Sequence, residues 1–223
     1  MRSIFNYINR NRAWFILSAI VLAGLLLRVY LLVTKLNGVD SDEAITGLMA
    51  VHILGGERPL LYYGLNYYGP LDAYLTAPIF AVFGSHAILL KIVPLVSSLV
   101  FIVAVYLLGK SLFSETIGLY SAVLAAVPPL MLQTLGLYAN ADYILTLVFG
   151  TFSLYLFDLF RTGSSWIKGI AIGVLLVIGL WIHPIIGYYV ATIVMVWILD
   201  QVRRLPIGIF YTRNRTPLVG RLA

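Results

Sequence analysis

The chain contains no cysteine and few charged residues. Without cysteine there can be no disulfide framework and no metal site built on thiolates. Asp, Glu, Lys and Arg make up 11% of the 223 residues, whereas a soluble domain needs about 25% to cover its surface. Hydrophobic residues make up 61%. Lipid must therefore be the main solvent, and the composition predicts an integral membrane protein.

Acidic residues are scarcer than basic ones, and the formal net charge is +6. The basic residues fall in short clusters between apolar runs. Such clusters are typical of topology determinants in membrane proteins and not of a nucleic-acid-binding surface. We therefore expect no nucleic-acid partner. The sequence also shows no soluble domain and no internal repeat.

Six apolar runs have about the length of a membrane-crossing helix, roughly 17 to 25 residues, although some are short. They cover residues 13–34, 88–108, 117–135, 143–160, 167–182 and 185–199. A seventh run, 71–83, suits a re-entrant or interfacial helix better than a span. The predicted fold is an all-α integral membrane protein with about six transmembrane helices, plus one or two interfacial helices in its first external loop.

The basic residues decide between six spans and seven. With six, most of them lie on one side of the membrane, and only Lys35, Arg58 and Lys91 are clearly on the other. With seven, every later loop changes sides and that excess is lost. The positive-inside rule favours six, with the N-terminus in the cytoplasm. Residues 1–202 then form the membrane module, 35–87 its external loop and 203–223 a basic cytoplasmic tail. Arg28, in the first span, is expected to extend to the interface.

The external loop opens with three carboxylates in four positions, Asp40, Asp42 and Glu43. One interpretation is a helix start, in which Asp40 is the N-cap and Glu43 completes a capping box. The other is that one carboxylate faces a cavity at the interface and acts as a general base. The two are compatible, because the cap uses Asp40 and leaves Asp42 free. Spacing alone favours the helix start.

Other outer residues also have two interpretations. The loop tyrosines fit an aromatic belt at the headgroup level, or a surface that stacks on sugar or lipid. Basic residues of the loop can anchor the interface or meet a phosphate, and a histidine at an outer turn can be an interfacial residue or a ligand. The candidate substrate-binding residues are Arg58, Tyr67, Tyr68, Asp72, Lys91, Asp142 and His183.

An ordered series of segments resembles a known family. It consists of the external "SDEA", then "GGERPLLYYGLNYYGPLDAYLTAPIFAVFG", then "LLKIVPLVSSL". With this topology, the series is similar to the N-terminal module of GT-C-type glycosyltransferases, above all bacterial members related to protein O-mannosyltransferases and aminoarabinose transferases. The later "LLGKSLFSETIGLYSAVLAAVPPL" and "YANADYILTLVFGTFSLYLF" resemble the helices that follow, although the family often has basic residues where this chain has Asn140 and Asp142.

The resemblance implies transfer of a sugar from a polyprenyl-phosphate carrier to an acceptor outside the cytoplasmic membrane, typically with inversion. It places the family's acidic residue at Asp42, with Glu43 beside it, so both are candidate catalytic residues. The expected partners are the lipid-linked donor, membrane lipid and an unidentified acceptor.

No cofactor or metal is predicted, although Asp42, Glu43 and His183 would suit a divalent metal if they lay together. Full family members usually continue for several more spans. A partner subunit that completes the enzyme, or an inactive scaffold that retains the fold, therefore remains an alternative.

Overall fold

The protein is built from helices. A computed structural model describes residues 12–35, 38–139, 143–163 and 165–204, and every regular element in those ranges is helical. The helices are α2 (Arg12–Thr34), α3 (Ser41–Leu54), α4 (Leu71–Phe83), η1 (Ala87–Lys91), α5 (Ile92–Leu112), α6 (Glu115–Ala126), α7 (Leu130–Leu135), α8 (Tyr143–Thr162), α9 (Trp166–Ile182), η2 (Pro184–Ile186) and α10 (Gly187–Arg204). The predicted all-α class is confirmed.

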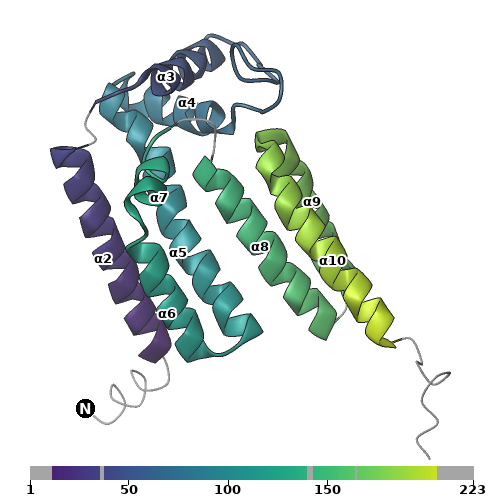
Figure 1. Cartoon of the computed structure of the whole chain (residues 1–223). Helices are drawn as coiled ribbons and strands as arrows, with labels where there is room; N and C mark the ends of the chain where they lie inside the picture. The colour runs from purple at the N-terminus through teal and green to yellow at the C-terminus, as the bar shows by residue number, and fades with distance from the viewer. Residues whose placement is uncertain (1–11, 36–37, 140–142, 164, 205–223) are drawn as a thin grey trace, which may run out of the picture.

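Helices α2, α5, α6, α8, α9 and α10 run side by side as a bundle, and α3 and α4 lie across one of its ends (Figure 1). We call this end the platform end. The start of α2 and the end of α10 lie at the opposite end. Within the described residues, four segments are long and apolar enough to cross a membrane: Arg12–Thr34, Ala87–Leu112, Tyr143–Thr162 and Pro184–Val202. Helices α4, α6 and α9 are apolar but shorter, so the number of spans remains a prediction.

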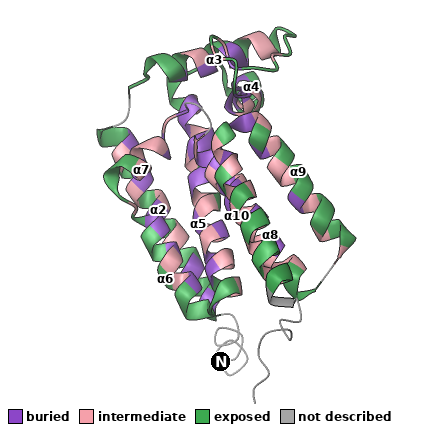
Figure 2. Cartoon of the chain, turned by 45° about the vertical axis from the view of Figure 1, so that its right-hand side comes forward, coloured by how far each residue is buried: buried purple, intermediate pink, exposed green. Residues whose placement is uncertain are grey.

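Helix α5 is at the centre of the bundle, packed against α2, α6 and α8. Buried residues are concentrated along it and beneath the platform, whereas α10 is mostly exposed (Figure 2). Close packing against α6 depends on glycine, because a Cβ at Gly118 would lie 2.7 Å from the carbonyl oxygen of Tyr106. Small residues that let helix backbones approach closely are typical of membrane bundles, where apolar burial gives little driving force.

The predicted run 117–135 is not one helix. Pro128 and Pro129 separate α6 from α7, as expected for residues that end or kink a helix. The break frees carbonyl groups, and in lipid such groups must be satisfied by protein. Arg28 of α2 satisfies them: its guanidinium donates to the carbonyls of Ala126 at 3.0 Å and Ala125 at 3.2 Å.

This arrangement differs from the expectation that Arg28 reaches the interface. The side chain is 3% exposed and also donates to the carbonyl of Gly24 at 3.1 Å. The physical reason is the broken helix, which offers backbone oxygens within the bundle that only a charged donor with several N–H groups can bond at once.

The platform begins with the predicted helix start. Asp40 is the N-cap of α3, and its carboxylate accepts from the backbone N–H of Glu43 at 2.8 Å. The Glu43 carboxylate accepts in return from the N–H of Asp40 at 3.3 Å. The capping box is therefore confirmed. Beneath it, α3 packs on α4 and on the loop between them through Met49, Tyr62, Tyr68 and Ala73.

The loop between α3 and α4 is bound to the end of α9 by Trp181. The indole N–H donates to the carbonyl of Leu60 at 2.8 Å, and the N–H of Gly69 donates to the carbonyl of Trp181 at 2.6 Å. A Cβ at Gly69 would overlap the indole ring, so this contact requires glycine. Trp181 thereby holds the loop tyrosines at a defined place above the bundle.

We predict that Arg28→Met lowers the free energy of unfolding by about 1–3 kcal/mol, because it leaves buried carbonyl groups without a donor. Arg12→Met is the control, since Arg12 on the same helix is exposed. Reversible unfolding in detergent micelles measures both. Equal stability of the two variants would contradict the capping role.

Candidate active site

Glu43 and Lys91 form a buried ion pair beneath the platform. The Lys91 ammonium lies 2.6 Å from both carboxylate oxygens of Glu43, and the two side chains are 2% and 0% exposed. Removing two charges from water is costly, and their attraction offsets that cost only with good geometry and further hydrogen bonds. The rest of the site supplies those bonds.

The Glu43 carboxylate joins separate segments of the chain. Besides Lys91 at the end of η1, it accepts from the backbone N–H of Ala139 at 3.0 Å and from that of Asp40. The ring of Tyr138 lies 4.2 Å from the Lys91 ammonium, a cation–π contact. The start of α3, the end of η1 and the segment before α8 therefore converge on one carboxylate.

Asp42, one residue before Glu43, is exposed. No described residue gives its carboxylate a hydrogen bond or an ion pair. Its backbone is nevertheless held, because the Tyr62 hydroxyl donates to the carbonyl of Asp42 at 2.6 Å. Thr46 lies 3.1 Å from the same hydroxyl and donates to the carbonyl of Ala139 at 2.8 Å. A carboxylate that is unengaged but rigidly placed can act as a base.

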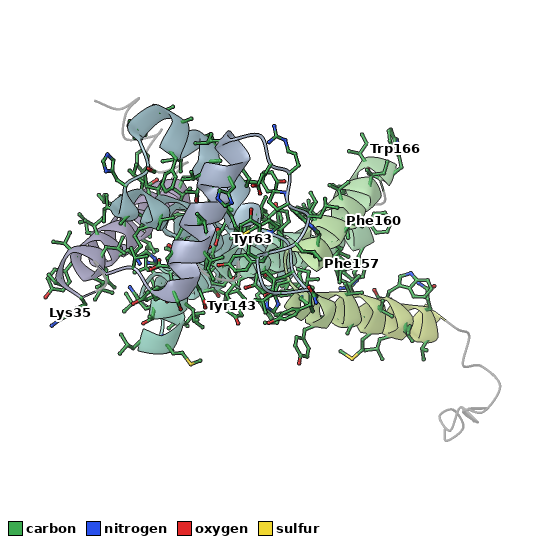
Figure 3. All side chains as sticks on the ribbon, turned by 90° about the horizontal axis from the view of Figure 1, so that it is seen from above. Lys35, Tyr63, Tyr143, Phe157, Phe160 and Trp166 are labelled. Atoms are coloured by element: carbon green, nitrogen blue, oxygen red, sulfur yellow. The ribbon has the colours of Figure 1, made fainter. Side chains whose placement is uncertain are left out.

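An aromatic row, defined here as Tyr62, Tyr68 and His183, leads from Asp42 to the end of α9. The Tyr62 and Tyr68 ring centroids are 4.9 Å apart, and Tyr68 stacks on His183 at 5.7 Å with an interplanar angle of 26°. Tyr143, the first residue of α8, lies 5.2 Å from the His183 ring. Viewed from the platform end, Tyr143 lies near the middle of the molecule (Figure 3). The row thus joins candidates far apart in the sequence.

Tyr67 is placed at the edge of this row. Its ring meets that of Tyr68 edge-on at 5.1 Å and lies 6.3 Å from His183. It is 55% exposed, whereas Tyr68 is 3% exposed. The Tyr67 ring is exposed and packs on the buried Tyr68, so it is suited to contact with a sugar ring or a lipid.

His183 is 8% exposed and its ring orientation is defined. Its Nδ1 accepts from the backbone N–H of Ile185 at 3.1 Å. In the neutral ring the proton is therefore on Nε2. Burial lowers the pKa of His183 below its ordinary value, so the ring is neutral at pH 7 and Nε2 is a donor.

The structure places the remaining candidates elsewhere. Arg58 is exposed and donates to the carbonyls of Glu57 at 2.7 Å and Ile53 at 3.2 Å, at the end of α3 farther from Asp42. Ile53 and Asp42 are about 16 Å apart along the helix axis. Asp72 is 3% exposed in the first turn of α4, and Asp142 lies outside the described residues. The ligand roles of these residues stay predictions.

The described residues contain no cluster of three or more His, Asp or Glu side chains that could hold a metal ion. Asp42 lies at the Tyr62 end of the aromatic row and His183 forms its other end, while Glu43 is directed into the ion pair. The metal site considered from the sequence requires Asp42, Glu43 and His183 to lie together, and Glu43 is instead bonded to Lys91.

Sequence reasoning considered Tyr62 only as one of the loop tyrosines and did not single out Thr46, so it missed that both hold Asp42 in place. Their signal is weak: Tyr62 is one of several tyrosines in "LLYYGLNYY", and Thr46 is one polar residue in the apolar run that follows the capping box. The spacing of Asp42 and Thr46 at i and i+4 does place them on one side of α3.

The fold and the site define a class of membrane protein in which helices lying across a bundle present an exposed carboxylate beside an aromatic row. The family model for dolichyl-phosphate-mannose-protein mannosyltransferase matches residues 68–211. The match covers more than half of the chain, which therefore belongs to this family and is a glycosyltransferase of the GT-C type. None of the curated proteins and none of the solved structures matches it.

The family match begins at residue 68, after Asp42 and Glu43. It includes Lys91, His183 and most of the aromatic row. The transferase class thus follows from the match, whereas the roles of the two carboxylates depend on the geometry described above.

The exposed pair Lys110–Glu115 is a matched control for the buried pair, because its N–O distance is also 2.6 Å while its side chains are 41% and 52% exposed. We predict that Lys91→Met or Glu43→Gln lowers the free energy of unfolding by about 3–5 kcal/mol. The double variant should lose much less than the sum. Lys110→Met and Glu115→Gln should each cost at most about 1 kcal/mol. A double-mutant cycle by chemical denaturation measures these values, and additive effects at Glu43 and Lys91 would contradict the pairing.

Proposed function

We propose that the protein transfers a sugar from a polyprenyl-phosphate carrier to an acceptor on the outer side of the cytoplasmic membrane, with Asp42 as general base. Family membership supports the transferase class. The observation that carries the assignment of the base is the contrast between two adjacent carboxylates. Glu43 is buried and bonded on every side, and Asp42 is exposed with no partner among the described residues.

The reaction needs one proton transfer and one displacement. An acceptor hydroxyl gives its proton to the Asp42 carboxylate while its oxygen forms a bond to the anomeric carbon. The bond from that carbon to the carrier's phosphate oxygen breaks, and its electron pair leaves with the phosphate. The leaving group is already an anion, so it needs a hydrogen-bond donor or a cation and no general acid.

Other residues of the site have supporting roles in this proposal. Tyr67 offers its exposed ring to the sugar, and Tyr68 supports it from behind. Glu43 and Lys91 hold the start of α3, so that Asp42 stays at its place above the aromatic row.

The charge distribution supports an outward-facing platform. Among the described residues, the end opposite the platform has more basic residues (Arg12, Lys110, Arg161, Lys168, Arg203 and Arg204) than the platform end (Lys35, Arg58 and Lys91). At the opposite end, Arg161 pairs with Asp200 at 2.6 Å and Lys110 with Glu115. An excess of Lys and Arg marks the cytoplasmic side of a membrane protein. The platform, with Asp42, then faces outward, and the protein crosses the cytoplasmic membrane several times.

We predict that Asp42→Asn lowers the rate of sugar transfer by about 10²- to 10⁴-fold, because it removes the base. The assay uses purified protein and polyprenyl-phosphate mannose, the sugar in the family's name, and follows loss of the lipid-linked sugar. Asp40→Asn is the matched control, since Asn caps a helix as well as Asp does. Equal activity of Asp42→Asn and wild type would overturn the assignment of the base. An inactive wild type that is well folded would indicate that a partner completes the enzyme.

We also predict that Tyr62→Phe lowers kcat by roughly two- to tenfold with little change in KM, which corresponds to losing one hydrogen bond of about 0.5–1.5 kcal/mol. The substitution keeps the ring but releases the carbonyl of Asp42. Tyr74→Phe is the control, because its hydroxyl donates to the carbonyl of Pro59 at 3.0 Å, away from Asp42. Equal losses in both variants would mean that Tyr62 has no special effect on Asp42.

A further inference from the structure

Lys91 and Arg58, the two cations predicted to bind substrate, are both engaged elsewhere in the described structure. Lys91 is buried against Glu43, and Arg58 is bonded to backbone carbonyls at the end of α3. A polar group near the aromatic row that remains available to a ligand would bind the leaving phosphate in their place. His183 has such a group, because only its Nδ1 has a hydrogen-bond partner among the described residues.

The position of His183 favours an anion. It precedes the segment Pro184–Val202, in which η2 continues directly into α10. The start of a helix carries a partial positive charge. The N–H of Ile185 polarises the imidazole through Nδ1, which makes the Nε2 proton a better donor. The Nε2–H group of His183 is therefore a positively polarised donor at the positive end of this helix.

The described residues whose rings contact that of His183 are uncharged tyrosines. The titratable groups against its ring are Tyr67 and Tyr68 from the loop before α4 and Tyr143 from α8. The described residues place neither a carboxylate nor a cation there, and burial is what lowers its pKa. A bound anion would therefore lie closer to the ring than any charged group that these contacts provide, and it would strongly affect the ring.

An apolar groove lies directly beside His183. It has a volume of about 150 Å³ and is lined by Leu132, Leu135, Gly136, Tyr143, Ile144, Leu147 and Ile185. Two of these residues also contact His183: Tyr143 through its ring and Ile185 through its N–H. A polar donor at the edge of an apolar groove is complementary to an amphiphile with an anionic head and a hydrocarbon tail.

We infer that His183 binds the phosphate of a prenyl phosphate as a neutral Nε2–H donor, with the first part of the prenyl chain in the adjoining groove. This inference rests on the proposed function, since it assigns the carrier's position in the same site. His183 is a binding residue here, and Asp42 remains the base.

The chain has three histidines, His52, His86 and His183, which makes the test direct. Protein labelled with ¹⁵N-histidine, in phosphatidylcholine nanodiscs, is titrated with farnesyl phosphate, and the imidazole signals are assigned by His52→Gln and His86→Gln. We expect the His183 signal alone to shift, and its pKa to rise by about one to three pH units next to the phosphate. No shift of His183, or equal shifts of all three signals, would overturn the inference.

Two further ligands separate the head from the tail. Farnesol lacks the phosphate, and inorganic phosphate lacks the chain. If farnesol raises the pKa of His183 as farnesyl phosphate does, the phosphate contact is wrong. If inorganic phosphate does so at the same concentration, the groove has no part in binding and the carrier assignment is wrong.

Two substitutions separate hydrogen bonding from ring stacking. His183→Gln keeps an N–H donor near the Nε2 position, whereas His183→Phe keeps the ring and loses the donor. Farnesyl phosphate binding, measured by calorimetry, should fall at least tenfold in His183→Phe and much less in His183→Gln. The reverse order would show a structural role only. Leu147→Trp, which fills the groove, should weaken farnesyl phosphate but leave the free-protein pKa of His183 unchanged.

These measurements need no turnover, so they are independent of Asp42. Transfer that depends on Asp42, without a His183 response, would contradict only the binding inference. A His183 response without Asp42-dependent transfer would contradict only the proposed function.

Discussion

The ion pair between Glu43 and Lys91 is the interaction on which the platform end depends. Two charges without access to water are stable only when each is compensated, and here the compensation comes from three segments. Lys91 belongs to η1, Ala139 belongs to the segment before α8, and Asp40 is the N-cap of α3. Because these groups must meet at one point, the direction of α3 is determined, and with it the position of Asp42.

The other buried charge follows the same principle in a different way. Arg28 has no carboxylate partner in the described structure, but it is surrounded by backbone oxygens that a pair of prolines has released. A chain with so few charged residues thus places two of its cations inside the protein. One holds the platform, and the other makes a broken helix tolerable within the bundle.

The sequence was most informative where the responsible residues are close together in the chain. Asp40 and Glu43 are three positions apart, and the capping box that they form was predictable from local geometry. Apolar runs likewise predicted the long helices. Lys91 and Glu43 are 48 positions apart, and the sequence showed only that both lie in the same half of the molecule. Arg28 was placed at the interface because its partners, freed by Pro128 and Pro129, lie on another helix. For His183, the sequence indicated a turn, but the protonated nitrogen depends on the N–H of Ile185.

Lys91 and Ala139 both follow Glu43 in the sequence, so these two partners are synthesised after it. Glu43 leaves the ribosome 48 positions before Lys91 and 96 positions before Ala139. At about 5–20 residues per second, the last partner follows roughly 5–20 s later. Until Lys91 has been made, the carboxylate has no compensating charge and must remain hydrated, so α3 can rest on the membrane surface but cannot dock. The set of bonds around Glu43 is therefore completed only after α2, α5 and α6 have been made, while α8, α9 and α10 are still to be synthesised.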